Sequence, residues 1–217
     1  MAEGPLAGVR VVDLTDDSGR FATKLMAEAG ASVVRLGSAS HGPAMTNGVG
    51  GGLLDWWYDG AKRAVGRDED PLATEAGRQA YRSLAVRADI VLETQAPGRL
   101  GELGLDHSDL VGDNPRLVQL SLTPFGRTGP RAGWQTTDLV ASAMGGVLSL
   151  CGLPDQPVNP WGRQSFNFAG FLASTTALAA LREARLTGRG QLIDMSLHEA
   201  VLTTVEQLFF QYWFDDL

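Results

Sequence analysis

The sequence predicts an α/β fold, in which a doubly wound, Rossmann-like parallel sheet carries helices on both faces. Short apolar runs rich in β-branched residues alternate along the chain with longer segments of helical periodicity. Glycines stand where several of these helices should end and the next strand should begin. Strands that alternate with helices imply a parallel sheet, because each crossover connection places a helix against one face. The 217 residues, 44% of them hydrophobic, suffice for one substantial core.

The elements follow from the pattern in chain order. Residues 9–14 form an apolar strand, residues 21–29 have helical spacing that ends at Gly30, and residues 32–36 form a second strand, which makes a β-α-β unit. The alternation then continues with a helix at 72–86, a strand at 90–93, a short helix near 108–111, a strand at 117–122, helices at 137–150 and 168–185, and a last strand at 191–195.

Composition excludes several classes of function. A net charge of −7 and a pI near 4.9 argue against nucleic-acid binding, because no basic stripe is present. The single cysteine, Cys151, excludes an internal disulfide framework and favours the cytoplasm. His41, His107 and His198 show no metal-ligand spacing, so no metal is expected. No signal peptide is recognisable and no apolar stretch reaches about 18 residues, so neither export nor a membrane span is indicated.

The turn after the first strand also excludes NAD. Residues 14–19 read Leu-Thr-Asp-Asp-Ser-Gly and lack the G-x-G-x-x-G pattern of dinucleotide-binding turns. Asp16 and Asp17 would place two carboxylates where the pyrophosphate of a dinucleotide has to lie. We therefore expect no nicotinamide cofactor.

Two longer motifs carry more information. Residues 114–130, NPRLVQLSLTPFGRTGP, combine a buried strand with a Pro-Phe-Gly-Arg-Thr-Gly-Pro loop, which begins at Pro124 and whose glycines, Gly126 among them, allow close backbone approach to a ligand. Residues 187–200, TGRGQLIDMSLHEA, end a helix on glycine and begin a strand at once. Together with LAGVRVVDLT at residues 6–15, these passages resemble the N-terminal half of the class III CoA-transferases, the carnitine dehydratase and bile-acid-inducible protein group.

The resemblance implies an acyl-CoA substrate and an aspartate nucleophile that attacks the thioester carbonyl. Counted back from Gly188, the position of that aspartate falls at Phe166, with Ser165 and Asn167 as neighbours. None of the three is a carboxylate, so we expect no catalytic residue at this position. The racemase branch of the same group would place a histidine near Thr137, where this chain has none.

The resemblance also implies contacts to coenzyme A. Basic residues that match family positions are Arg35, Lys62 and Arg63, which we expect to bind CoA phosphates together with the loop residues Pro124 and Gly126. Two expected arginines are replaced, one by Ala96 and the other by Glu102. CoA or an acyl-CoA is thus the expected substrate, at a weakened site.

The end of the chain is dense in aromatic residues. Residues 197–214 have helical character, and the last part contains Phe209, Phe210, Tyr212, Trp213 and Phe214. Large apolar side chains are costly to leave in water, so a further surface should cover them. We therefore divide the chain into a CoA-transferase-like domain at 1–196 and a connecting or interface helix at 197–217.

These observations lead to one hypothesis and two alternatives. The preferred hypothesis is a partner subunit or half with a degenerate active site, completed by a second CoA-transferase-like chain or by a C-terminal half. The first alternative is an active acyl-CoA transferase, dehydratase or hydratase that uses Asp13, Asp138, His198 or Glu199. The second alternative is a non-enzymatic module that binds CoA thioesters or serves as structure.

Overall fold

The computed structural model describes residues 4–37, 51–66, 70–153 and 155–214. His41 and residues 215–217 of the expected terminal helix lie outside these ranges. Within them, no helix combines the length and the apolar character that a membrane span requires.

Six parallel strands form the main sheet in the order β3-β2-β1-β4-β5-β8, and a short antiparallel pair, β6 and β7, lies apart from it. The strands are β1 Arg10–Leu14, β2 Ser32–Leu36, β3 Arg63–Val65, β4 Ile90–Glu93, β5 Val118–Thr123, β6 Gly152–Leu153, β7 Gln156–Pro157 and β8 Gln191–Ser196. The predicted doubly wound parallel sheet is confirmed. The strand order reverses between β1 and β4, which places a crevice outside their carboxyl ends.

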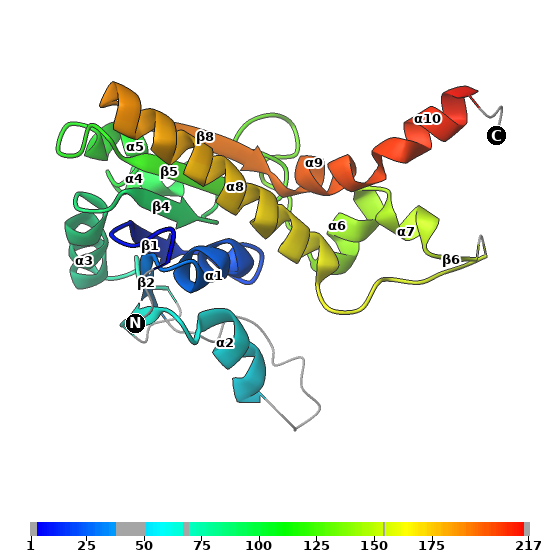
Figure 1. Ribbon diagram of the computed structural model, residues 1–217, viewed down its shortest axis with the longest axis horizontal. Helices are drawn as coiled ribbons and strands as arrows, with labels where there is room; N and C mark the ends of the chain where they lie inside the picture. The colour runs from blue at the N-terminus through cyan, green and yellow to red at the C-terminus, as the bar shows by residue number, and fades with distance from the viewer. Residues whose placement is uncertain (1–3, 38–50, 67–69, 154, 215–217) are drawn as a thin grey trace.

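Helices cover both faces of this sheet (Figure 1). They are α1 Arg20–Glu28, α2 Gly51–Asp59, α3 Glu75–Ala85, α4 Arg99–Glu102, α5 His107–Leu110, α6 Asp138–Met144, α7 Val147–Leu150, α8 Gln164–Thr187, α9 Leu197–Leu202 and α10 Glu206–Phe214, with a 3₁₀ turn at Thr203–Val205. Helices α1, α6, α8 and α9 enclose one core with the sheet, and α3, α4 and α5 enclose the other.

Helix α8 packs against α1 through a buried face that is built largely from small residues. These are Ala169 and the residues Gly170, Ala173, Ala177, Ala180 and Ala184, of which the last five are spaced three or four apart. A side chain at Gly170 would lie 3.0 Å from the main chain of Ala22 and from the Cβ of Phe21. The sequence therefore allows the long helix to cross the sheet in direct contact with α1.

Several elements differ from the sequence-based expectation. The helix expected at 137–150 is divided at Gly145 and Gly146, and Gly146 has a left-handed φ of 84°. Helix α8 begins at Gln164, so residues 165–167 lie in its first turn rather than before it. The terminal segment is not one helix: α9 buries Leu197, Ala200 and Val201 in the first core, and α10 projects outward at the end of the molecule (Figure 1). Helices α2 and α4 and strand β3 were not predicted.

Candidate functional site

A pocket of about 270 Å³ occupies the crevice between the ends of β1 and β4. The residues that line it are Leu14, Thr15, Asp16, Leu36, Asp70, Pro71, Thr94, Gln95, Ala96 and Arg99. Ligands of doubly wound sheets bind at this crevice, because both flanking loops leave the sheet there in opposite directions.

Arg99 is the cation of this pocket. Its guanidinium forms an ion pair with Asp70 and donates to Oε1 of Gln95 at 2.9 Å, while 35% of the side chain stays exposed. Sequence analysis missed this residue. Arg99 stands one helical turn before Glu102 in α4, and residues three apart share a helix face. A cation at position 99 therefore lies on the same face of α4 as the arginine that the family resemblance places at position 102.

A second and larger cleft of about 1480 Å³ opens from the crevice toward α2 and the start of α8. It shares Asp16, Thr94, Gln95 and Ala96 with the pocket, so the two spaces adjoin the same wall. Its walls include Leu54, Trp57 and Tyr58 of α2, Pro124 and Trp134 to Leu139, and Asn159 to Asn167 apart from Ser165. Pro124, expected to approach a ligand, lies in this wall.

Phe166 lines the cleft at the position where the family resemblance expects an aspartate. Its ring is half-buried and packs against the core beneath α8. Its main-chain N–H donates to Oδ1 of Asp138 at 3.0 Å, which satisfies one of the free donors at the start of α8. Ser165 is buried, and Oδ1 of Asn167 accepts the hydroxyl of Tyr58 at 2.9 Å. Residue 166 thus provides an apolar wall.

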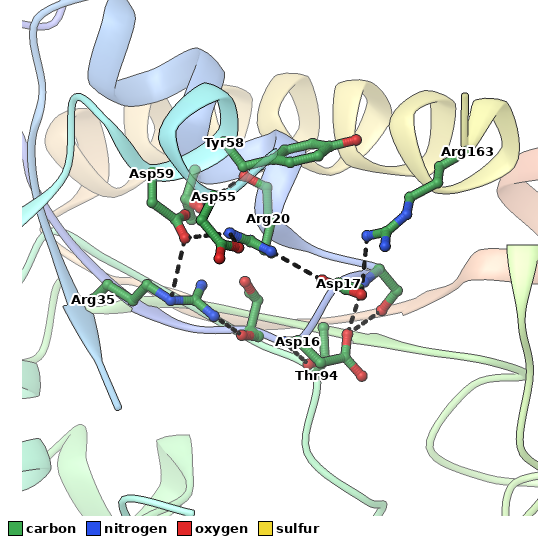
Figure 2. Close-up of polar contacts among 12 residues, drawn as sticks. Asp16, Asp17, Arg20, Arg35, Asp55, Tyr58, Asp59, Thr94 and Arg163 are labelled. Carbon is green, nitrogen blue, oxygen red and sulfur yellow. Dashed lines mark hydrogen bonds and ion pairs between the residues drawn. The ribbon is translucent and has the colours of Figure 1, made fainter. Parts of the chain in front are cut away.

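A buried ion cluster lies between β1, β2 and α1 (Figure 2). Asp13 is fully buried, and its Oδ2 accepts Lys62 Nζ at 2.9 Å and Arg35 Nη1 at 3.3 Å. Its two oxygens also accept the hydroxyls of Thr15 and Thr23, each at 2.7 Å. Burial by itself raises the pKa of Asp13. Lys62, Arg35 and the two threonines together lower it by a larger amount, so the pKa of Asp13 lies far below its usual range.

This cluster holds two of the residues expected to bind CoA phosphates. The side chains of Arg35 and Lys62 are each 1% exposed, and Asp59 supplies a second carboxylate to both. Arg63 lies exposed on the edge strand β3. Gly126 adopts a left-handed φ of 87° in the loop after β5. The structure therefore brings Arg35 and Lys62 together in the interior and leaves Arg63 outside the cluster.

Arg20, the first residue of α1, links α2 to α1 and to the turn after β1. Its guanidinium contacts Asp55 at 2.7 Å, Asp17 at 3.0 Å and also Asp59 (Figure 2). Burial lowers the pKa of Arg20, yet the three carboxylates, Asp59 first, raise it above its ordinary value. Asp17 also accepts Nη1 of Arg163 at 2.9 Å, which links the start of α8 to the turn after β1.

The four alternative catalytic candidates are not gathered in one place. Asp13 is enclosed by the ion cluster, and Asp138 lines the cleft. His198 uses Nε2 to contact the carbonyl of Met144 at 2.9 Å, while its main-chain N–H donates to the carbonyl of Pro124 at 3.1 Å. Glu199 is exposed in the first turn of α9. Of the four, Asp138 alone borders the cleft.

A second buried carboxylate lies on the opposite face of the sheet. Glu93 is 2% exposed and accepts the main-chain N–H of Gln95 at 2.6 Å. Burial raises the pKa of Glu93 to about 7, against opposing contributions from Ser121, Gln95 and Arg127. Arg127 forms an ion pair with Asp106, and this ion pair connects the loop after β5 to the residue that precedes α5.

Comparison with known proteins points in one direction. A sequence profile of CoA-transferase family III matches residues 6–216. The BbsE subunit of succinyl-CoA:(R)-benzylsuccinate CoA-transferase from Thauera aromatica is 39% identical over 213 residues, which cover 94% of this chain and 51% of BbsE. The beta subunit of succinyl-CoA–L-malate CoA-transferase from Chloroflexus aurantiacus is 33% identical over 212 residues, which cover 94% and 52%.

Solved structures agree. The crystal structure of a CAIB/BAIF family protein from Brucella suis superimposes with a TM-score of 0.83 at 30% identity, and covers 97% of this chain and 58% of that protein. The chain therefore spans about half the length of the curated relatives it matches.

Proposed function

Because the chain belongs to CoA-transferase family III, we propose that it is a partner subunit or half with a degenerate active site in an assembly that processes acyl-CoA thioesters. The observation that carries this proposal is Phe166. A phenyl ring has no lone pair with which to attack a thioester, and no carboxylate replaces it at residues 165–167. The carboxylate that forms the acyl anhydride and releases the CoA thiolate then has to come from another polypeptide segment.

In this proposal the chain contributes part of the CoA site. The crevice pocket takes the nucleotide end of CoA, and Arg99 donates to its phosphates in place of the arginines absent at 96 and 102. This arrangement requires Asp70 to release Arg99 and requires the phosphates to lie away from Asp16. Arg63, Pro124 and Gly126 remain proposed contacts. Arg35 and Lys62 would reach a phosphate only if Asp13 and Asp59 released them, so we assign them first to holding β1 and β2 together.

Titration calorimetry with CoA and a transfer assay test the proposal together. The isolated chain should bind CoA, and Arg99→Ala should weaken binding by about tenfold or more, because a charge-assisted hydrogen bond to phosphate contributes roughly 1.5 to 3 kcal/mol. Arg182→Ala, an exposed position on α8, is the matched control. The isolated chain should move no CoA from acetyl-CoA to succinate. Transfer by the chain alone would overturn the partner role, and absence of CoA binding would overturn the CoA site.

One observation favours the alternative of an active enzyme. Asp138 places a carboxylate oxygen 3.0 Å from the main-chain nitrogen of residue 166, within the cleft. If that carboxylate replaced the family aspartate, the isolated chain would transfer CoA and Asp138→Asn would abolish the transfer. A chain that binds acyl-CoA but supports no transfer with any family partner would instead be a binding module. The single cysteine is consistent with a cytoplasmic site of action in each case.

A further inference from the structure

Tryptophan is concentrated in the large cleft. Three of the five tryptophans of the chain, Trp57, Trp134 and Trp161, line it, together with Tyr58 and Phe166. The three indoles are 44%, 51% and 94% exposed. A flat apolar group that covers an aromatic ring binds favourably, because the contact buries a large apolar area. A pair of rings gains additional energy from its preferred stacked or edge-to-face geometry. Trp57 stacks on Phe21 and Trp134 meets Phe125 edge-on, yet about half of each of these two side chains and nearly all of Trp161 stay exposed in the described part of the chain.

The cleft adjoins the pocket proposed for the nucleotide end of CoA. It shares the wall of Asp16, Thr94, Gln95 and Ala96 with the crevice pocket. A ligand whose nucleotide end occupies the pocket can therefore carry its thioester into the cleft without leaving the surface. This step rests on the proposed function, because it takes the pocket as the CoA site.

The charges of the cleft oppose an anionic acyl group. Arg163 is the sole cation among the described residues that line it, and its guanidinium is already paired with Asp17. Asp16 and Asp138 are two further carboxylates of the same wall, and their hydrogen-bond donors are uncharged N–H and O–H groups. A carboxylate on the far end of the acyl group would approach three carboxylates of this wall against one cation that is already paired, and like charges repel. Arg131, whose guanidinium lies 5.3 Å from the centre of the Trp134 ring, is outside the residues that line the cleft.

We propose that this cleft selects CoA thioesters whose acyl group is uncharged and aromatic. The aryl ring lies among Trp57, Trp134 and Trp161, with Phe166 as the apolar wall at the position that the resemblance assigns to aspartate. The same wall disfavours dicarboxylic acyl groups. In this proposal the Phe166 ring cannot act as a nucleophile, but it contributes to binding the acyl group.

Calorimetry of the full chain with four probes tests this proposal. We expect phenylacetyl-CoA to bind about tenfold tighter than acetyl-CoA, and succinyl-CoA to bind no tighter than acetyl-CoA. Trp134→Ala and Trp161→Ala should each reduce the advantage of phenylacetyl-CoA at least threefold and leave the affinity for CoA itself unchanged. Trp213→Ala, an exposed tryptophan on α10 outside the cleft, should change neither value.

The outcomes separate the two proposals. Equal affinities for phenylacetyl-CoA and acetyl-CoA, with CoA still bound, would overturn the aromatic specificity and leave the CoA site intact. Tighter binding of succinyl-CoA than of phenylacetyl-CoA would overturn it as well. Absence of binding by CoA and by all three thioesters would overturn both proposals. If Trp134→Ala does not fold, Trp161→Ala decides the matter, because a side chain that is 94% exposed contributes little packing.

Discussion

Replacing Asp13 by asparagine should destabilise the protein strongly, although it changes one charge and almost no volume. The carboxylate is fully buried and accepts five hydrogen bonds, three from Thr15 and Thr23 and two from the cations Lys62 and Arg35. Asparagine offers one acceptor oxygen in place of two and turns an NH₂ group toward donors. Removing one partner of a buried ion pair costs about 3 to 5 kcal/mol. Asp59 remains beside both cations, so we expect about 3 kcal/mol.

Urea unfolding of the chain at pH 7 measures this loss. With a slope of about 3 kcal/mol per M for a chain of this size, a loss of about 3 kcal/mol lowers the midpoint by about 1 M. Asp113→Asn is the matched control, because Asp113 is 57% exposed and pairs with Arg82 at the surface. It should cost about 1 kcal/mol or less. A loss for Asp13→Asn no larger than that of the control would refute the assignment of Asp13 as the centre of a buried cluster.

The pH dependence gives an independent check. The pKa of Asp13 is lowered in the folded protein, so its ionised form contributes stability that is fully present above the ordinary value of 3.8 and is lost as the pH falls below it. The difference between wild type and Asp13→Asn should therefore stay constant from pH 7 to about pH 4 and shrink only at lower pH. The double variant Asp13→Asn with Lys62→Met should lose less than the sum of the two single variants, because it leaves one fewer buried charge unpaired.

Three further predictions concern other parts of the molecule. Burial raises the pKa of Glu93 from 4.5 to about 7, so the stability that its neutral form contributes is lost as the pH rises through 7. The unfolding free energy of Glu93→Gln, taken relative to wild type, should therefore be higher at pH 8 than at pH 5 by up to about 3 kcal/mol. Equal differences at both pH values in urea melts would contradict this. Phe166→Asp should create no CoA transfer in the isolated chain, and acyl exchange by this variant alone would show that the partner is dispensable. Gly190→Ala should cost about 1 to 3 kcal/mol in thermal unfolding, because its Cβ would lie 1.9 Å from the carbonyl oxygen of Leu117, whereas Gly133→Ala, with no atom within 4 Å, should cost little.

Much of the fold could be predicted from the sequence. Strands 32–36 and 90–93 have the expected bounds, because β-branched runs flanked by glycine or by charged turns specify a buried strand locally. Helix α4 and strand β3 were missed, because a single helical turn and a three-residue edge strand carry too few periodic positions to stand out. The break between α6 and α7 depends on Gly145, where a side chain would meet Val201 of α9 at 2.4 Å. That constraint lies between distant segments and is invisible locally.

The candidate site divides in the same way. The sequence located the substitution at Phe166 and the basic residues Arg35, Lys62 and Arg63, since these follow from motif spacing alone. Burial of Arg35 and Lys62 against Asp13 was not predictable, because the partners come from β1, β2 and the segment before β3. Ion pairs form between side chains that lie close together in the folded chain, and the spacing of residues along the sequence does not reveal which ones these are.

By itself the sequence determined the parallel α/β fold with its longer strands and helices, the family resemblance and the absence of a carboxylate at residues 165–167, because each follows from local composition and motifs. Only the tertiary structure decided that Arg99 borders the crevice, that Arg35 and Lys62 are enclosed, and that three tryptophans face one cleft. The physical reason is that the parallel sheet brings the carboxyl ends of distant strands to one edge. Side chains far apart in sequence become neighbours there, and their charges and surfaces acquire partners only in the folded chain.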